Sequence, residues 1–393
     1  MPRLPLLLLV GIATQTMTPL VAFTAPVMAV VAAPEFGVTP AQVGLYVAVL
    51  YFFAMLSAGV AGALIARFGA IRTTQLALAS TALGVLLLLP ASVPLALLGA
   101  LLIGAGYGPI TPASSHLLAP VTTLRSRPFV FSVKQTAVPL GAALAGVIVP
   151  QMIGLDGWRA AVLLVAAIVV VTAVAVQPVR ARCDTDRNIE ARISLDIVAA
   201  VRSALAHPPL RRLAILSFTF AGLQMSFGAY FVTFLVERLE LTLVAAGIAF
   251  TVGQATSIGF RIIWGAAAER IMAARALLIV LALTMAAASA LTLAMSPAWS
   301  LPAIAGLGAL FGVSAVAWNG LFLAEIVRVT SVERTAAATG GALVFTFGGM
   351  MAGPAVFGAL LAAGASYGAA FTVLGGVALL SALPLAWADR PAP

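Results

Sequence analysis

The chain has 393 residues, of which 62% are hydrophobic and only 8% charged, and its mean hydropathy is +1.13. This composition excludes an ordinary water-soluble globular protein, because too few polar side chains are present to cover a hydrated surface. The net charge of +9 comes from arginines scattered over short loops without interleaved aromatic residues, which argues against nucleic-acid binding.

Apolar stretches of about 20 residues, the length that crosses roughly 30 Å of hydrocarbon, recur along the whole chain. Backbone groups in lipid must be satisfied within the structure, and the alternation typical of a membrane β-barrel is absent, so helices are expected. The sequence therefore predicts an all-α membrane protein with twelve transmembrane helices, at 5–32, 43–66, 74–90, 95–119, 128–150, 158–178, 212–236, 243–268, 276–296, 301–327, 335–363 and 367–388.

The basic residues indicate the orientation. If the N-terminus is cytoplasmic, 17 of the 21 Lys and Arg residues lie on the cytoplasmic side, and the positive-inside rule favours this arrangement. The first apolar run continues to about Ala32, which is too long for a signal peptide and predicts an uncleaved helix. We expect an integral protein of a bacterial inner membrane with both termini cytoplasmic. Its single cysteine, Cys183, excludes an intramolecular disulfide.

Polar residues interrupt the apolar helices of the first half. Gln15 lies within helix 5–32, and Tyr107 and Thr111 lie beside two prolines in GAGYGPITPASSH on helix 95–119. Interrupted helices at membrane depth often line a transporter cavity, so we expect these side chains to face one. The alternative is that they only support packing. His116, nearer the cytoplasmic end, is interpreted as a hydrogen-bonded structural residue, with a role as proton carrier as the alternative.

Lys134 is the only lysine of the chain. It lies roughly 10 Å along its helix from Arg127. Small residues such as Ala137 and Gly141 continue its stripe, and helices approach one another along such stripes, so Lys134 is expected to face protein or a cavity. The alternative is that its long stem carries the ammonium back to the cytoplasmic surface.

A loop of some thirty residues joins the two halves. Its segment SLDIVAAVRSALA, at 194–206, predicts a short amphipathic helix at the cytoplasmic face. We therefore divide the chain into an N-terminal six-helix bundle at 1–178, a cytoplasmic linker at 179–211 and a C-terminal six-helix bundle at 212–393.

In the second half, the spacing of Gln254, Ser257 and Arg261 places them on one face of helix 243–268. A polar stripe of this kind does not face lipid. Tyr230 on helix 212–236 and Asn319 on helix 301–327 are further candidates for a cavity lining.

Two internal repeats make the halves pseudo-symmetric. LSAGVAGALIARFGAIR at 56–72 aligns with GFRIIWGAAAERIMAAR at 259–275, and HLLAPVTTLRSRPFVFSVK aligns with LAEIVRVTSVERTAAATGG at an offset of 207. In the first repeat a Gly precedes two Arg residues at the same spacing in both copies: Gly62, Arg67 and Arg72, then Gly265, Arg270 and Arg275.

These halves, the long middle loop, the two basic turns and GWR at 157–159 resemble the major facilitator superfamily over essentially the whole chain. The resemblance implies alternating access, in which the halves rock about a midplane site while the basic turns latch the cytoplasmic side. Glu325 is expected to pair with Arg270 or Arg275 in this latch. The implied latch residues are Gly62, Arg67, Arg72, Gly265, Glu269, Arg270, Arg275 and Glu325.

The chain departs from the family pattern at two positions. Ala66 stands in the first basic turn where the family usually has Asp, so we expect a weaker latch there than at Glu269. Ala100 stands where proton-driven drug exporters often carry Arg, which disfavours drug export. FRIIWGAAAER resembles the pattern of monocarboxylate and oxalate/formate carriers, in which an Arg at the position of Arg261 binds the substrate carboxylate.

The deep charges are Lys134 and Arg261, and no Asp or Glu lies at similar depth. Charges inside a membrane are expensive and mark function, and guanidinium binds carboxylate in a bidentate fork. We therefore expect a secondary active transporter, a symporter or antiporter, for a small organic anion such as a monocarboxylate. The expected substrate site comprises Arg261, Lys134, Gln254, Ser257, Tyr107, Thr111, Gln15, Tyr230 and Asn319.

Two other transport functions remain open, namely efflux of drugs or other hydrophobic compounds and transport of an inorganic anion such as nitrate or cyanate. An enzyme is not supported, because one Cys, two His and no clustered acids cannot assemble a metal site or a catalytic triad. We expect no cofactor, no metal, no nucleic-acid partner and a monomer in the lipid bilayer. The direction of transport and coupling to a proton or an exchanged anion are left open.

Overall fold

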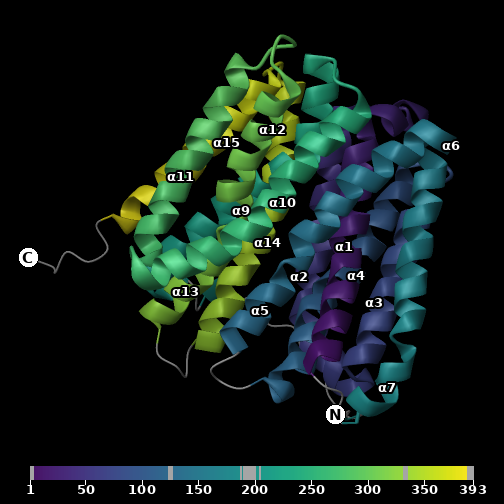
Figure 1. Cartoon of the computed structure of the whole chain (residues 1–393), viewed down its shortest axis with the longest axis vertical. Helices are drawn as coiled ribbons and strands as arrows, with labels where there is room; N and C mark the ends of the chain where they lie inside the picture. The colour runs from purple at the N-terminus through teal and green to yellow at the C-terminus, as the bar shows by residue number, and fades with distance from the viewer. Residues whose placement is uncertain are drawn as a thin grey trace, which may run out of the picture. The chain divides into compact units, whose positions relative to one another are not determined.

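The computed structural model describes residues 4–122, 127–185, 188, 201, 202, 205–330 and 335–386, and every regular element within these ranges is helical. The chain forms two compact units. The first comprises Met1–Pro40 and Val49–Leu195, and the second comprises Ala41–Ala48 and Asp196–Pro393. In Figure 1 the first unit runs from purple to teal, and the second, apart from Ala41–Ala48, runs from teal through green to yellow.

The first unit is built from long helices and a few short 3₁₀ turns. Its elements are α1 (Leu4–Ala32), η1 (Ala33–Phe36), η2 (Pro40–Gln42), α2 (Val43–Phe68), α3 (Ala70–Leu86), α4 (Val93–Leu118), η3 (Ala119–Val121), α5 (Arg127–Gln135), α6 (Ala137–Ala175) and α7 (Gln177–Cys183). The first residues of α2, up to Ala48, belong to the second unit.

The second unit has the same kind of construction, with one exception in its middle. Its elements are α9 (Pro208–Leu239), α10 (Leu243–Arg270), α11 (Ala274–Leu291), η4 (Thr292–Ala294), α12 (Leu301–Phe311), η5 (Gly312–Val316), α13 (Asn319–Val329), α14 (Thr335–Ala362), α15 (Tyr367–Ala382) and η6 (Leu383–Leu385). The exception is η5, a π-helical segment that separates α12 from α13.

Ten helical segments in the described ranges are long and apolar enough to cross a membrane, against the twelve expected. One difference is α3, whose 17 residues cover only part of the expected span at 74–90. The other is the run Val133–Ala175, which covers most of the two spans expected at 128–150 and 158–178. The fold is an all-α membrane protein, as the sequence predicts.

Gly157 divides this long run into two pieces. Its backbone has φ 82° and ψ 173°, whereas the residues on both sides are helical. Glycine takes a positive φ without steric cost, which explains why the chain changes direction at the start of the GWR segment. A straight helix of the 39 residues of α6 would measure about 58 Å at 1.5 Å per residue, nearly twice the hydrocarbon thickness.

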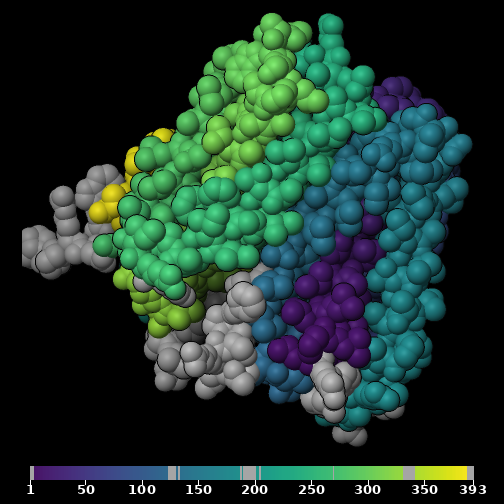
Figure 2. Space-filling model, viewed as in Figure 1, coloured from purple at the N-terminus to yellow at the C-terminus, as the bar shows by residue number. Residues whose placement is uncertain are grey.

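Small residues bring equivalent helices together in the two units. In the first unit α1 packs along α6, and in Figure 2 the purple surface of α1 is flanked by the blue and teal surface of α6. In the second unit α9 packs along α14. A Cβ added at Gly141 would overlap the backbone of Thr16, and one added at Gly353 would overlap the backbone of Gly222. Each unit therefore contains a close helix contact made at a glycine.

The exterior of each unit carries aliphatic side chains, as contact with lipid requires. Leu155, Val171 and Leu380 are 75%, 67% and 65% exposed. The expected boundary at residue 178 falls inside the first unit, because α7 packs against α3. The amphipathic helix expected at 194–206 lies mostly outside the described residues, which include only 201, 202, 205 and 206 of it.

Candidate functional site

Lys134 is buried among neutral groups of the first unit. Its side chain is 1% exposed. Its Nζ donates hydrogen bonds to Ser115 Oγ at 2.6 Å and to the carbonyl oxygen of Thr111 at 3.3 Å, and it lies 5.2 Å from the ring centroid of Phe131. Within the described part of the chain no carboxylate forms an ion pair with it. Lys134 therefore faces protein and does not extend to the membrane surface.

The acceptor that Lys134 uses comes from the proline-containing part of α4. Pro109 and Pro112 lie inside this helix and lack the N–H groups of ordinary residues. Between them, the carbonyl of Thr111 accepts from Lys134 and also from the hydroxyls of Ser114, at 3.0 Å, and Ser115, at 2.8 Å. A helix region rich in hydroxyls and prolines thus supplies the polar environment that a cation at this depth requires.

Gln15 extends this polar cluster to α1. Its Nε2 donates to Gln135 Oε1 at 2.6 Å, and its Oε1 accepts from Ser114 Oγ at 3.2 Å. Gln15 is 1% exposed. Three residues of the expected site, Gln15, Thr111 and Lys134, are therefore brought together by α1, α4 and α5. The sequence analysis missed Gln135, although its position next to Lys134 was an available signal.

A cavity of about 590 Å³ lies beside this cluster, between α2, α4 and α5. Two of its lining residues, Ser115 and Phe131, also contact the Lys134 ammonium. The lining is largely apolar, with Ser115 and His116 as its polar side chains, and comprises Gly62, Ile65, Ala66, Pro112, Ser115, His116, Ala119 and Phe131. Tyr107 does not line this cavity and packs against Tyr51 with ring centroids 5.5 Å apart.

Arg261 in the second unit is turned toward the π-helical segment η5. Its Nη2 donates to the carbonyl oxygen of Val316 at 3.0 Å, and Asn319 Nδ2 lies 3.5 Å from the same oxygen. Trp264, one turn further along α10, donates from Nε1 to the carbonyl oxygen of Val313 at 2.9 Å. Side chains often satisfy backbone groups where a helix departs from α geometry, and π segments recur at functional sites. Arg261 and Asn319 are thus brought together at Val316.

The rest of the expected stripe on α10 is buried. Gln254 is 3% exposed and Ser257 is fully buried. The Ser257 hydroxyl donates to the backbone carbonyl of Gln254 at 2.7 Å, within its own helix. These positions confirm that the stripe faces protein, whereas their contact with a substrate stays a prediction.

Tyr230 has a packing role in the structure. Its hydroxyl donates to the carbonyl oxygens of Ala41, at 2.8 Å, and Pro354, at 3.0 Å, and its ring stacks on Phe357 at a centroid distance of 4.4 Å. The hydroxyl is therefore engaged by backbone acceptors of the second unit. This contact between distant segments could not be read from the spacing of residues in the sequence.

Glu325 does not have the expected partner. Its carboxylate pairs with Arg328, with Nη2–Oε1 at 2.7 Å and Nε–Oε2 at 3.0 Å. Both of its oxygens are thus engaged by an arginine other than the expected Arg270 or Arg275. Residues three positions apart lie on the same helix face, so the local partner is within immediate reach. The side chain of Glu269 lies outside the described residues, and its latch role stays a prediction.

The glycines of the two basic turns are alike in their surroundings. At both Gly62 and Gly265, no atom lies within 4 Å of the place where a Cβ would be. Arg67, Arg72 and Arg270 are exposed, and Arg275 is half-buried. The structure therefore confirms that both turns end long apolar helices, α2 and α10.

A family model of the Major Facilitator Superfamily matches residues 7–326. The chain belongs to this superfamily. Transporters of this fold are also its structural neighbours, so this superfamily member is a membrane transporter and not an enzyme. A search of curated proteins finds no match.

Three solved structures illustrate the likeness in fold. A POT family transporter in complex with 5-aminolevulinic acid has a TM-score of 0.78 at 11% identity, over 97% of this chain and 94% of that one. The nucleoside transporter NupG, in a mutant form, has a TM-score of 0.76 at 13% identity, over 97% and 100%. A bacterial homolog of the human lysosomal transporter Spinster has a TM-score of 0.71 at 16% identity, over 98% and 95%.

Proposed function

We propose that this superfamily member is a secondary active transporter of a small organic anion, with a carboxylate as the charged group. The observation that carries the proposal is the burial of the Lys134 ammonium among neutral partners, Ser115, Thr111 and Phe131. Removing an ammonium from water costs several kcal/mol, and hydrogen bonds to neutral groups offset this only in part. An anionic substrate would supply the missing opposite charge.

The cavity beside Lys134 supports an anion that has an apolar body. Ile65, Pro112 and Phe131 form apolar walls, and Ser115 connects the cavity to the ammonium. A bare inorganic anion such as nitrate would gain little from these walls, because the hydrophobic contribution grows with the apolar area that is buried. A lysine stem is flexible, so a small rotation would bring Nζ to a carboxylate in the cavity.

Arg261 is the second cation of the proposal. Its contact with the Val316 carbonyl uses one of the five guanidinium N–H donors. A substrate carboxylate that displaced this carbonyl would gain two parallel charge-assisted bonds. The resemblance of FRIIWGAAAER to the monocarboxylate and oxalate/formate carriers supports the same role.

The neighbouring structures do not select a substrate. They include a transporter in complex with 5-aminolevulinic acid and a nucleoside transporter, and at 11% to 16% identity they share only the fold with this chain. We further propose a monomer in a bacterial inner membrane, with both termini cytoplasmic. Coupling to a proton or to an exchanged anion would make it a symporter or an antiporter.

A thermal-shift screen of the purified full-length protein tests the anion proposal. Lactate, oxalate, nitrate and ethidium would each be added to the parent and to Lys134→Met, because a ligand of the folded state raises the apparent stability. We expect a carboxylate to raise the Tm of the parent and to lose most of this effect in Lys134→Met. Stabilisation by ethidium in both proteins, with none by the anions, would favour drug export instead.

A further inference from the structure

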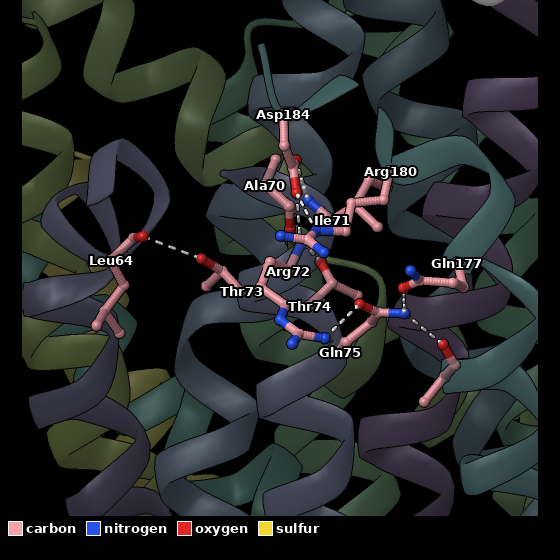
Figure 3. A network of polar contacts seen from close by, with 11 residues as sticks. Leu64, Ala70, Ile71, Arg72, Thr73, Thr74, Gln75, Gln177, Arg180 and Asp184 are labelled. Atoms are coloured by element: carbon pink, nitrogen blue, oxygen red, sulfur yellow. Dashed lines mark hydrogen bonds and ion pairs between the residues drawn. The ribbon is translucent and has the colours of Figure 1, made fainter. Parts of the chain in front are cut away.

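An acidic side chain from a distant part of the chain reaches the first basic turn. Ala66 leaves this turn without an acid of its own, and Asp184 follows α7 at the end of the same unit. Asp184 Oδ1 accepts a hydrogen bond from the amide of Ile71 at 2.8 Å, and Oδ2 accepts from the amide of Arg72 at 3.0 Å. Figure 3 shows the carboxylate pointing at these two amides.

These two amides need an external acceptor. They belong to the first turn of α3, where backbone N–H groups have no partner within the helix and carry a partial positive charge. Gly69 precedes the helix and has no side chain that could cap it. The carboxylate of Asp184, whose side chain is 5% exposed, therefore acts as the cap of α3 from 113 residues away.

The turn is shaped to admit this carboxylate. Gly69 has φ +89°, and a Cβ at this position would overlap the carboxyl group of Asp184. Both the backbone angle and the space thus require glycine. Arg180 Nε, at 3.6 Å from Oδ2, adds a partly exposed ion pair.

The chain around Asp184 forms further hydrogen bonds in the same region. The first basic turn and the end of α7 are together called the corner below. The amide of Asn188 donates to the carbonyl oxygen of Ala66 at 2.6 Å, which engages the last turn of α2. Gln75 Nε2 in α3 donates to Gln177 Oε1 at 2.9 Å and to the carbonyl of Ala173 at 3.0 Å. The segment after α6 is therefore tied to α2, to α3 and to the turn between them.

We propose that Asp184 is a positioning residue of the first basic turn, and that it replaces the acid missing at position 66. It holds the turn against the end of α7 within the first unit. Arg67 and Arg72 are consequently presented from a fixed backbone.

Cys183 provides a native probe of this corner. It is the only cysteine, it is half-buried, and it packs against the cluster that contains Ile65, Ala70 and Ile71. A maleimide therefore reports a single thiol in the full-length parent protein.

Because hydrogen bonds to charged groups are stronger than neutral ones, loss of Asp184 should open the corner. We expect Asp184→Ala to raise the alkylation rate of Cys183 about tenfold, which corresponds to about 1.4 kcal/mol.

Matched variants separate this effect from others. Asp184→Asn keeps one acceptor oxygen, so its rate should rise about threefold, and it carries the test if Asp184→Ala does not give monodisperse protein. Asp156→Ala removes an exposed acid of α6 and should leave the rate unchanged. Arg180→Ala removes only the partly exposed ion pair and should change it by less than threefold.

A second probe distinguishes positioning from general loosening. In a Cys183→Ser background, Ser92→Cys places a thiol before α4, at the opposite end of α3 from Asp184. Asp184→Ala should leave the alkylation rate of this thiol unchanged. An equal rise in alkylation rate at both positions would mean that the whole fold has loosened. An unchanged rate at Cys183 would mean that the carboxylate does not fix the turn. Either result overturns the proposal.

Discussion

The ammonium nitrogen of Lys134 lies 2.6 Å from the hydroxyl oxygen of Ser115, and Ser115 also lines the adjacent cavity. This pair places a buried positive charge one side chain away from a space that a small molecule can fill. A serine cannot neutralise a lysine, so the geometry combines good hydrogen bonding with an uncompensated charge. Stability and anion binding should therefore respond in opposite directions when the charge is removed.

Lys134→Met is expected to raise thermal stability while it removes most of the stabilisation by carboxylates. Methionine fills a similar volume without a charge, and the Ser115 hydroxyl keeps its bond to the carbonyl of Thr111, so no buried partner is left unsatisfied. We expect a gain of about 1–2 kcal/mol, as for other residues whose function opposes stability. Thermal unfolding in one detergent, with and without lactate, measures both effects.

Lys134→Arg, which keeps the charge, should retain partial binding. A Lys134→Met protein with parental response to lactate contradicts this prediction.

Gly69→Ala is expected to destabilise the first unit, in contrast to Gly62→Ala. The alanine at 69 would require φ +89° and would overlap Asp184, so we expect a loss of about 1–3 kcal/mol. At Gly62 the space is open and the residue lies within helix α2, where alanine is favoured over glycine by about 0.5–1 kcal/mol. Thermal unfolding of both variants checks the difference. Equal stabilities would show that the turn adjusts without Asp184.

Gly353→Ala tests the close contact of α9 and α14. A methyl group there would overlap the backbone of Gly222, whereas at Gly376 in α15 no atom lies within 4 Å. Overpacking of a tight contact typically costs about 1–3 kcal/mol, so Gly353→Ala should lower the Tm and Gly376→Ala should not. If both variants melt like the parent, the two helices do not approach as closely as described.

Much of the fold could be predicted because the relevant signals are local. The apolar spans, the basic turns and the burial of Gln254 and Ser257 follow from hydropathy and helical periodicity. Lys134 was recognised as a deep cation, although hydropathy alone could not decide between burial and snorkelling. The small-residue stripe beside it pointed to the arrangement that the structure has.

The missed features depend on contacts between distant segments. Asp184 looked like one charge among several in a mixed loop, because its partners Ile71 and Arg72 lie more than 100 residues away. The hydroxyl of Tyr230 donates to the carbonyl oxygen of Ala41, and helical periodicity gives no information about such a contact between distant segments. For Glu325 a distant partner was expected and the structure has a local one. Its ion pair is with Arg328, three residues away, and not with Arg270 or Arg275.

The topology can be tested with reporter fusions. The distribution of arginines predicts that a fusion after Gln177 reports the cytoplasm and a fusion after Leu239 the periplasm. An alkaline-phosphatase and green-fluorescent-protein pair at each site would provide matched readouts. Reversed signals at both sites would remove the cytoplasmic assignment of the basic turns.

Arg261 offers the sharpest test, because two roles predict different results for the same variants. If the guanidinium grips a carboxylate, Arg261→Lys keeps the charge but loses the planar fork, and Arg261→Ala loses both. Truncation of one partner of a buried charged pair costs on the order of 2–5 kcal/mol of binding free energy. Affinity for the carboxylate that the thermal-shift screen identifies should therefore fall in the order parent, Arg261→Lys, Arg261→Ala.

Trp264→Phe is the matched control for the alternative role. Trp264 holds η5 through the carbonyl of Val313, as Arg261 does through that of Val316, but it carries no charge. If Arg261 only anchors η5, both Arg261→Ala and Trp264→Phe should lower the Tm while carboxylate affinity stays near the parental value. If Arg261 binds the substrate, only the arginine variants should lose affinity. Titrations with the carboxylate and with its neutral amide, on monodisperse protein, distinguish these outcomes, because the amide lacks the charge that the guanidinium recognises.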